Sequence, residues 1–349
     1  MVDFAGWDMP VQYSSIVAEH LCIRSTVGLF DISHMGRLEF RGAGAEHLLS
    51  LVLTNDVTKL KIGDIRYSLI CRQDGGILDD VLIYRLPNRW LLVVNASTRE
   101  KIVNWLHQQS GFGEAGFADL TLSTGMIAVQ GPLAQTLVSQ AVGEDLSGMK
   151  YYAGRECEIC GTGGLVSRTG YTGEDGFELV LPASHAEQVW LWLLNHGGDA
   201  GILPAGLGCR DTLRLEAAMP LYGHELSETT DPLTAGLAFA VRLSKPQFTG
   251  RQALVAIQAA GLTSARVGLI LEGRRIAREE TPVLADGQPV GRVTSGTFSP
   301  TLQKSIAMAY VSSAYSAIGT ELQLDLRGSL TSAVVTPLPF YRRAGSGAG

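Results

Sequence analysis

The stretch Gly75-Gly-Ile-Leu-Asp-Asp-Val-Leu-Ile-Tyr84 places two adjacent carboxylates inside an apolar, β-branched run. The run predicts a strand, in which neighbouring side chains point to opposite faces. Asp79 and Asp80 therefore face different environments, one of which can be water and the other a pocket. Asp80 shares its face with Leu82 and Tyr84, so an acid, an apolar floor and an aromatic ring lie on one surface. Such a surface suits a flat, nitrogen-rich ligand.

The residues on either side of this run predict two further strands. Together they form an antiparallel meander over residues 65–72, 77–86 and 90–95. Its turns are predicted at Asp74-Gly75-Gly76 and Pro87-Asn88-Arg89. If Asp74-Gly75 is a two-residue loop, Tyr67 pairs across from Leu82 and joins the face that carries Asp80. A three-residue loop would reverse that parity, so the position of Tyr67 depends on the turn.

Beyond the meander, hydrophobic periodicity predicts alternating helices and strands. Helices are expected at 15–26, 45–54, 98–109, 132–142, 185–196, 206–218 and 249–260. Further strands are expected at 37–41, 122–129, 155–168 and 176–182. From Ser264 the chain changes to short alternating strands, which predict a small all-β barrel. We therefore expect an α+β fold: two interwoven α+β domains with antiparallel sheets over 1–262, a barrel over 263–343 and a flexible tail over 344–349.

Composition limits the function classes. The chain has 349 residues, of which 46% are apolar and 18% charged, so it can bury substantial cores and is expected to be a soluble globular protein. No apolar run approaches the roughly 20 residues needed to span a bilayer, and the first residues resemble neither a signal peptide nor a transit peptide. We therefore expect no membrane span and a cytoplasmic location. The formal net charge of −6 argues against nonspecific nucleic-acid binding.

Several common catalytic motifs are absent. The chain has no Gly-x-Ser-x-Gly, no phosphate loop and no His-Glu-x-x-His, so hydrolase, nucleotide-triphosphatase and zinc-protease functions lack support. Cys157 and Cys160 are spaced like a metal or redox pair, but an ordinary strand is the favoured interpretation because no second pair follows. His34 and His224 lie in turn-like contexts, where a structural role is favoured over a functional one.

Glu178 lies in a glycine-rich segment that leads into a strand, Ser167-Arg-Thr-Gly-Tyr-Thr-Gly-Glu-Asp-Gly-Phe-Glu-Leu179. It alternates with Phe177 and Leu179, so it points away from the apolar face of that strand. A solvated sheet surface explains such a residue. Alternatively, its carboxylate could accept the paired amino and ring N–H groups of a pterin-like heterocycle.

Arg210 and Arg214 lie one turn apart on a predicted helix. Asp211 could pair with Arg214 at the i, i+3 spacing, which leaves Arg210 as the better candidate for an external anion. Structural ion pairing and ligand binding remain equally consistent with this pattern.

Taken together, these motifs identify a resemblance that covers nearly the whole chain. The sequence resembles the glycine cleavage system T-protein family of folate-dependent aminomethyltransferases. The matching segments include Met1-Val-Asp-Phe-Ala-Gly-Trp7, Phe30-Asp-Ile-Ser-His-Met-Gly36, 75–84, 167–178, 210–223, 248–254 and 294–302. Each segment is weakly specific alone, whereas their common order is specific for the family.

The resemblance implies three domains around a central opening that holds tetrahydrofolate as co-substrate, with no metal. It also implies a partner, the lipoylated H-protein, which delivers an aminomethyl group on sulfur. The products implied are ammonia and 5,10-methylenetetrahydrofolate.

The family's functional residues match positions in this chain. Asp80 matches the acidic residue beside the reactive folate nitrogens, which makes it the expected catalytic residue. Glu178 matches the carboxylate that holds the pterin, and Arg210 an arginine of the folate site. The remaining expected folate-binding residues are Met35, Tyr67, Tyr84, Tyr152, Tyr171 and Arg342. The basic residues Arg274, Arg275 and Arg278 are a candidate docking surface for the H-protein, although a solvated turn is the favoured interpretation.

The sequence departs from the family pattern at a few places. The family usually has additional residues before its first motif, Cys209 replaces a more common Ala, and Phe239 stands where Trp is common. Two other functions remain as alternatives: a tetrahydrofolate-dependent demethylase of a small methyl donor, and a non-catalytic folate-binding factor for iron–sulfur assembly. The second lacks support because its Lys-Gly-Cys-Tyr-x-Gly-Gln-Glu motif is replaced here by Arg168-Thr-Gly-Tyr-Thr-Gly-Glu174.

Overall fold

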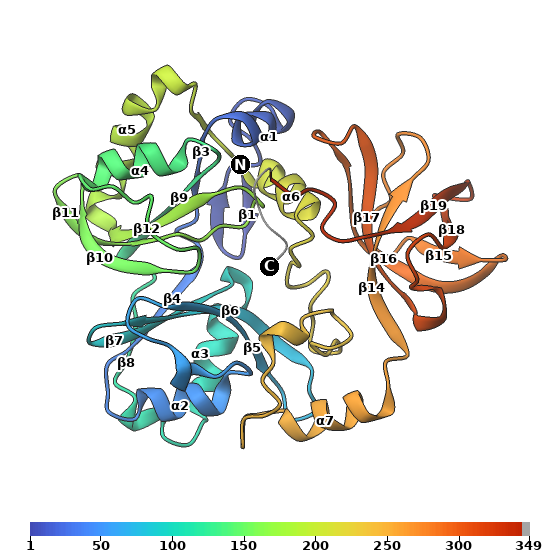
Figure 1. Cartoon of the computed structure of the whole chain (residues 1–349), viewed down its shortest axis with the longest axis horizontal. Helices are drawn as coiled ribbons and strands as arrows, with labels where there is room; N and C mark the ends of the chain where they lie inside the picture. Colours follow the sequence, from blue (N-terminus) through green and yellow to red (C-terminus); the bar gives the residue numbers. More distant parts are fainter. Residues whose placement is uncertain (344–349) are drawn as a thin grey trace.

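The strand that carries Asp79 and Asp80 is the second strand of a five-stranded antiparallel sheet. The computed structural model describes residues 1–343, and the predicted tail, 344–349, lies outside the described residues. The sheet has the order β5-β6-β7-β4-β8. Its strands are β4 (Gly36–Phe40), β5 (Ile65–Cys71), β6 (Ile77–Leu86), β7 (Arg89–Val94) and β8 (Phe117–Asp119). Helices α2 (Ala45–Val52) and α3 (Arg99–His107) cover one face and form the first domain (Figure 1).

The predicted meander of β5, β6 and β7 is confirmed, and so is the pairing of Tyr67 with Leu82. The turn, however, differs from the two-residue loop on which that pairing was made conditional. Cys71 pairs with Ile77, so the loop between them contains an odd number of residues. The pairing register then shifts between Ile70 and Cys71. Leu78 has no partner in the ladder, which makes it the extra residue of a β-bulge. The bulge restores the parity that a three-residue loop would have reversed.

The second domain contains a six-stranded sheet in the order β10-β11-β12-β9-β3-β13. Its strands are β3 (Gly28–Asp31), β9 (Thr124–Gln130), β10 (Gly154–Ile159), β11 (Thr162–Ser167), β12 (Gly176–Pro182) and β13 (Leu203–Pro204). Helices α4 (Ala134–Val142) and α5 (Ala183–His196) cover its outer face. The predicted single strand over 155–168 is wrong, because Cys160 and Gly161 adopt positive φ and turn it into the β10–β11 hairpin.

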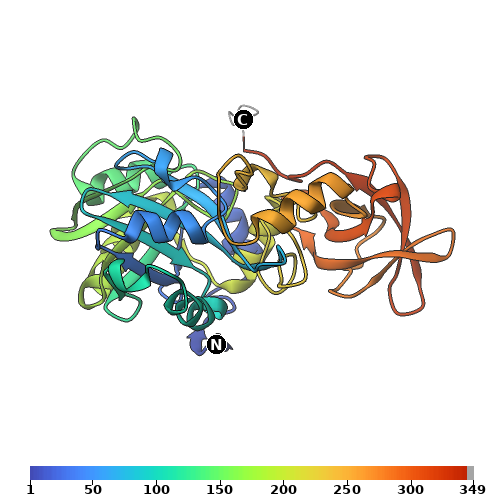
Figure 2. The same ribbon diagram turned by 90° about the horizontal axis from the view of Figure 1, so that it is seen from below.

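The C-terminal domain is the predicted barrel. It closes in the order β14-β17-β16-β15-β18-β19. Its strands are β14 (Ser264–Leu271), β15 (Pro282–Ala285), β16 (Gln288–Ser299), β17 (Lys304–Ser312), β18 (Glu321–Asp325) and β19 (Leu330–Thr336). Helix α7 (Arg251–Ala260) leads into it along the outside of the molecule (Figure 2).

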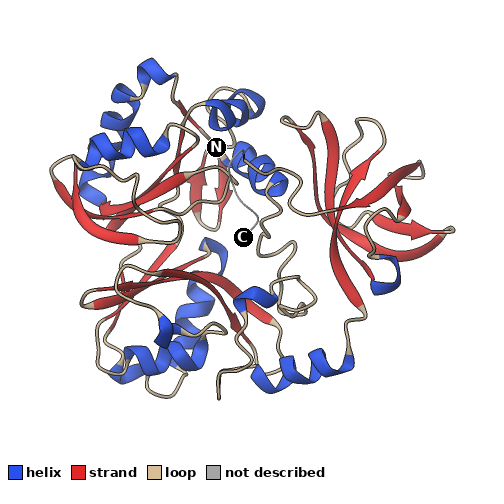
Figure 3. Ribbon diagram, in the orientation of Figure 1, coloured by secondary structure: helices blue, strands red, loops and turns tan. Residues whose placement is uncertain are grey.

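The three bodies lie around a central region that contains little regular structure (Figure 3). The hairpin of β1 (Val2–Phe4) and β2 (Trp7–Met9), helix α1 (Ile16–Ser25) and helix α6 (Leu207–Glu216) border this region (Figure 1). The inner faces of the two sheets meet in an apolar core that includes Phe30, Tyr84, Leu91, Met126 and Leu165. That core fixes the first sheet against the second, so residues of both sheets border one central space.

Candidate functional site

A cavity of about 450 Å³ lies where the three domains meet. The inner face of the first sheet, the inner face of the second sheet, helix α6 and the barrel all contribute side chains to it. Its polar lining residues are His34, Tyr67, Asp80, Asn95, Ser97, Tyr152, Tyr171, Glu178, Arg210, Tyr222, His224 and Arg266. Its apolar lining includes Phe4, Met35, Leu82, Val93, Met126 and Phe239. The cavity is therefore an apolar slot with a few carboxylates, phenols and guanidinium groups, as expected of a small-molecule site.

Asp80 presents its carboxylate to this cavity from the middle of β6. Its Oδ2 accepts a hydrogen bond from the Tyr67 hydroxyl at 3.0 Å, and its Oδ1 accepts one from Nδ2 of Asn95 at 2.7 Å. Burial raises the pKa of Asp80, and the Tyr67 and Asn95 hydrogen bonds oppose that shift. Both oxygens are thus held in fixed directions while the carboxylate still faces the cavity.

Asp79 lies on the opposite face of β6, as the alternation predicts. It is fully buried. Its Oδ1 accepts from Nδ2 of Asn95 at 2.8 Å and its Oδ2 from the Asn95 backbone N–H at 3.1 Å. The sequence left either solvent or a structural partner beside Asp79, and the structure shows the structural partner, Asn95.

Glu178 reaches the cavity from β12, opposite the first sheet. Its Oε2 accepts a hydrogen bond from the Thr169 hydroxyl at 2.5 Å, and only 6% of the residue is exposed. Burial raises its pKa, while Thr169 and the charge of Arg210 oppose the shift. Within residues 1–343 it forms no ion pair, so its second oxygen is available to a ligand N–H donor.

The two arginines of α6 differ as the spacing suggests. Arg214 is buried and pairs with Asp211 at 2.7 Å and with Glu225 at 2.8 Å. Arg210 lies over the Tyr171 ring with 4.6 Å between its Cζ and the ring centroid, and it has no ion-pair partner among the described residues. Burial lowers the pKa of Arg210, and the attraction of Tyr171 and Glu178 only partly opposes that shift. Arg210 is thus the arginine that an anionic ligand can reach.

Four other expected residues line the cavity. Tyr67 stacks on Phe239 with 5.8 Å between ring centroids, and the Tyr171 hydroxyl donates to the Pro220 carbonyl at 2.5 Å. Tyr152 and Met35 also border the space. Phe239, which stands where the family more often has Trp, thus keeps an aromatic surface beside Tyr67.

Two expected residues lie elsewhere. Tyr84 is fully buried in the core where the two sheets meet and is not among the cavity lining, and its contact with the ligand stays a prediction. Arg342 is exposed, donates to the Leu338 carbonyl at 3.4 Å and also lies outside the lining.

Sequence reasoning missed Asn95 as a site residue. The pairing of Leu82 with Val93, continued by two places along each strand, sets Asn95 beside Asp80. That register could have been derived from a two-residue turn at Pro87-Asn88, but the turn was predicted one residue too long. Arg266, which reaches the cavity from the barrel, gave no signal in its surrounding sequence.

His34 also lines the cavity, where a structural role had been favoured. It is 2% exposed, and its Nδ1 has no hydrogen-bond partner among the described residues. Burial and the nearby charge of Arg210 lower its pKa to about 3, so the ring is neutral at physiological pH. The fold thus leaves a neutral imidazole, as well as carboxylates, around the space.

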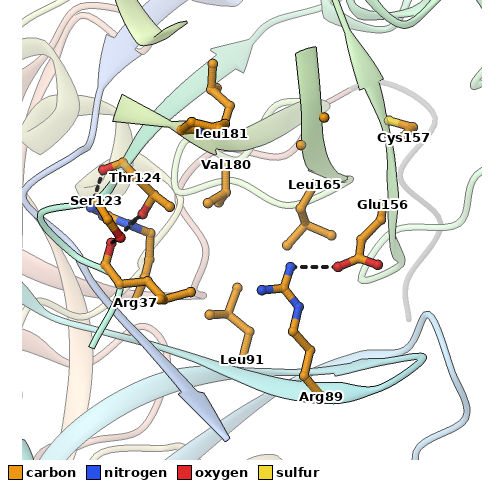
Figure 4. A pocket seen from close by; sticks show the side chains of 14 residues that line it. Arg37, Arg89, Leu91, Ser123, Thr124, Glu156, Cys157, Leu165, Val180 and Leu181 are labelled. Carbon is orange, nitrogen blue, oxygen red and sulfur yellow. Dashed lines mark hydrogen bonds and ion pairs between the residues drawn. The ribbon is translucent and has the colours of Figure 1, made fainter. Parts of the chain in front are cut away.

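A second hollow, of about 370 Å³, lies between β7 and β11–β12 at the edge of the two sheets (Figure 4). Its floor is apolar and includes Leu91, Leu165 and Val180. Its arginines already have partners: Arg89 pairs with Glu156 at 2.7 Å, and Arg37 donates to several backbone carbonyls. The central cavity therefore has the better supply of groups for binding a polar ligand.

The described residues contain no group of three or more His, Cys, Asp and Glu side chains arranged to hold a metal ion. None of the helices in the described part of the chain combines the length and apolarity needed to cross a bilayer.

Comparisons with known proteins identify the family of this chain. Residues 1–245 match the family model of the GCVT N-terminal domain, and residues 265–342 match that of the glycine cleavage T-protein C-terminal barrel domain. An aminomethyltransferase of Streptomyces avermitilis is 48% identical over 98% of this chain and 94% of its own length. One of Symbiobacterium thermophilum is 46% identical over 98% and 93%. The crystal structure of the glycine cleavage system aminomethyltransferase T from Bartonella henselae superposes with a TM-score of 0.91 at 36% identity, covering 97% of this chain and 93% of that one. The chain therefore belongs to the glycine cleavage T-protein family of aminomethyltransferases.

Proposed function

We propose that this aminomethyltransferase transfers the methylene of an S-aminomethyl-dihydrolipoyl H-protein to tetrahydrofolate in the central cavity. The carbon–sulfur and carbon–amine bonds of the donor break, and the carbon bonds to two folate nitrogens. The two protons that those nitrogens release go to the thiol and to the departing amine. The products are the dihydrolipoyl thiol, ammonia and 5,10-methylenetetrahydrofolate.

The observation that carries this proposal is the placement of two unpaired carboxylates on opposite walls of one apolar slot. Asp80 and Glu178 come from different domains, face the same cavity and form no ion pair among residues 1–343. A pterin presents an amino group and ring N–H donors at one end and its reactive nitrogen at the other. The cavity can therefore hold the pterin by Glu178 and leave its reactive end beside Asp80.

Asp80 has the role of an electrostatic catalyst in this proposal. Departure of the amine gives the transferred carbon iminium-like positive charge, and a fixed carboxylate stabilises that charge as it develops. The hydrogen bonds from Tyr67 and Asn95 hold the carboxylate in place beforehand, so little reorganisation is needed during the reaction.

The other residues bind and orient the folate. Tyr67, stacked on Phe239, offers an aromatic face to the flat ring, and Tyr152, Tyr171 and Met35 complete the walls. Arg210 carries the positive charge inside the cavity that an anionic group of the co-substrate can meet. Arg342 lies outside the described lining, and its contact with the acidic tail of folate stays a prediction. Binding of this co-substrate by these residues needs no metal.

The assay that tests the proposed donor supplies the enzyme with tetrahydrofolate and either aminomethylated H-protein or free methyl donors. We expect 5,10-methylenetetrahydrofolate and ammonia from aminomethylated H-protein, and no product from the free methyl donors. Product from a small amine, sulfonium or aryl ether, with none from the H-protein, would instead establish the demethylase function. A cytoplasmic location stays a prediction. Arg274, Arg275 and Arg278 stay a candidate docking surface for the H-protein, with a solvated turn as the favoured interpretation.

A further inference from the structure

One amide links the two carboxyl groups of β6 through the sheet. The two hydrogens on Nδ2 of Asn95 serve Asp79 Oδ1 at 2.8 Å on one face and Asp80 Oδ1 at 2.7 Å on the other. The same nitrogen lies 3.1 Å from the backbone carbonyl of Asp80, and the Asn95 backbone N–H serves Asp79 Oδ2 at 3.1 Å. Asn95 is thus a shared donor between a buried carboxyl group and the carboxyl group of the cavity.

Asp79 is placed where a negative charge is costly. It is fully buried on the face of β6 that carries Val81 and Ile83 into the first domain's core. Among residues 1–343, no lysine, arginine or histidine forms an ion pair with it. An uncompensated carboxylate in such surroundings binds a proton more readily than it does in water.

The groups facing Asp79 do not supply a counter-charge by direct contact. Asp80 adds a second acid from the same strand, and Thr98 adds a hydroxyl from the turn after β7. Tyr222 approaches from the loop after α6, and its hydroxyl accepts from Lys101 of α3 at 2.6 Å. The ammonium group of Lys101 is itself paired with Glu228 at 3.0 Å. Burial, followed by repulsion from Asp80, raises the pKa of Asp79 to about 8.

We propose that Asp79 and Asn95 are positioning residues for Asp80: Asp79 is held as a neutral carboxylic acid, and Asn95 holds Asp80 as the one carboxylate of the cluster. This inference rests on the proposed role of Asp80 in the transfer reaction. The pair then shares a single proton at neutral pH. The proton stays on Asp79 because Asp79 is fully buried in the first domain, whereas Asp80 faces the polar cavity and accepts from the Tyr67 hydroxyl.

The contacts of Asn95 fix the orientation of its amide. Its Nδ2 donates to Asp79 Oδ1 at 2.8 Å and lies 3.1 Å from the Asp80 backbone carbonyl, and its own backbone carbonyl accepts from the Thr98 hydroxyl at 3.1 Å. These contacts keep the amide turned so that its hydrogens, and not its oxygen, point at Asp80.

Infrared spectroscopy of enzyme labelled with ¹³C at the aspartate side-chain carboxyls tests where the proton lies. Asp79 and Asp80 are the aspartates of the described chain whose pKa is raised, so few other bands interfere. We expect a protonated-carboxyl band at pH 6.5 that disappears with a midpoint near pH 8. The band should be lost in Asp79→Asn and retained in Asp80→Asn. The exposed-site control Asp145→Asn should also retain it.

Absence of the band from the wild-type enzyme, or its loss in Asp80→Asn and persistence in Asp79→Asn, would overturn the proposal. If Asp79→Asn does not fold, the wild-type titration and Asp80→Asn still decide between these outcomes. The measurement needs no H-protein, so it would give the same result even if the proposed transfer reaction were wrong.

Kinetics then test the positioning role. Asp79→Asn replaces the titrating acid with a group that stays neutral, so the pH profile of its transfer rate should lack the wild-type ionisation near pH 8. Asn95→Ala should lower kcat about tenfold or more while the folate dissociation constant changes by less than about threefold. A merely structural role predicts an unchanged pH profile for Asp79→Asn. An Asn95→Ala variant that loses folate affinity but keeps its kcat would also refute the proposal.

Discussion

Replacing Asp80 by Asn removes a negative charge from the cavity and changes almost nothing in shape. Two unit charges about 4 Å apart attract each other by about 4 kcal/mol at an effective dielectric constant near 20. Since about 1.4 kcal/mol corresponds to a factor of ten, removing the carboxylate should slow transfer about a thousandfold. The new amide must also direct its NH₂ group at either Tyr67 or Asn95, which now donate to the carboxylate. Tyr67 can rotate its hydroxyl to accept that N–H, so the fold should be kept.

Single-turnover formation of 5,10-methylenetetrahydrofolate from aminomethylated H-protein measures this effect, and tetrahydrofolate binding is measured separately by titration calorimetry. We expect the rate to fall about a thousandfold, with the folate dissociation constant within about fivefold of wild type. The matched control, Asp145→Asn, removes an exposed aspartate of the second domain and should leave both quantities unchanged. Near-wild-type turnover in Asp80→Asn would refute the assigned role, and loss of folate binding would make Asp80 a binding residue instead.

Three further predictions follow from the site and its supports. Glu178→Gln should weaken tetrahydrofolate binding about tenfold in calorimetry, since an amide replaces one acceptor with a donor; unchanged affinity would place the pterin elsewhere. Arg214→Leu should destabilise the protein by about 3 to 5 kcal/mol in urea denaturation because it leaves Glu225 buried without its cation, whereas Arg210→Leu should chiefly reduce folate affinity. Equal losses of stability in the two variants would contradict that division. Burial alone would raise the pKa of Glu216, but the hydrogen bond and attraction to His20, together with the charge of Arg24, lower that pKa to about 2. The stabilisation by ionised Glu216 is therefore complete above the ordinary carboxyl pKa and is lost as the pH falls towards 2. Urea denaturation between pH 5 and about pH 2 should therefore show a smaller decline in stability for Glu216→Gln than for wild type, and identical slopes would refute the coupling.

The meander and the barrel could be predicted because strand alternation and turn residues are local signals. The pairing of Tyr67 with Leu82 was also right, but only because the bulge at Leu78 restored the parity of a longer loop. Nothing in the local sequence distinguishes that combination from a simple two-residue loop. A register derived from turn length alone is therefore sensitive to one extra residue.

The turn between β6 and β7 shows the same sensitivity with the opposite result. Leu86 pairs with Arg89, so the loop is Pro87-Asn88 and Asn95 lies beside Asp80. The predicted turn is one residue longer and would align Ala96 with Asp80. That register gives no reason to expect Asn95 beside Asp80.

Tertiary packing decided the remaining differences. Tyr84 shares the face of Asp80 along β6, and the alternation rule correctly groups the two. Alternation cannot show where the second sheet closes over the first, and that closure places Tyr84 in the core and Asp80 in the cavity. The resemblance to the family identified Asp80, Glu178 and Arg210, which the structure brings to the same cavity from three separate elements.

The most direct test is a stoichiometric reaction of the wild-type enzyme with aminomethylated H-protein and tetrahydrofolate. The methylene carbon of the donor is labelled with ¹³C, and folate and ammonia are quantified together. We expect one equivalent of labelled 5,10-methylenetetrahydrofolate and one of ammonia for each donor consumed, with no product when the folate is omitted. Folate that binds in the cavity without acquiring the label would contradict the proposed transfer.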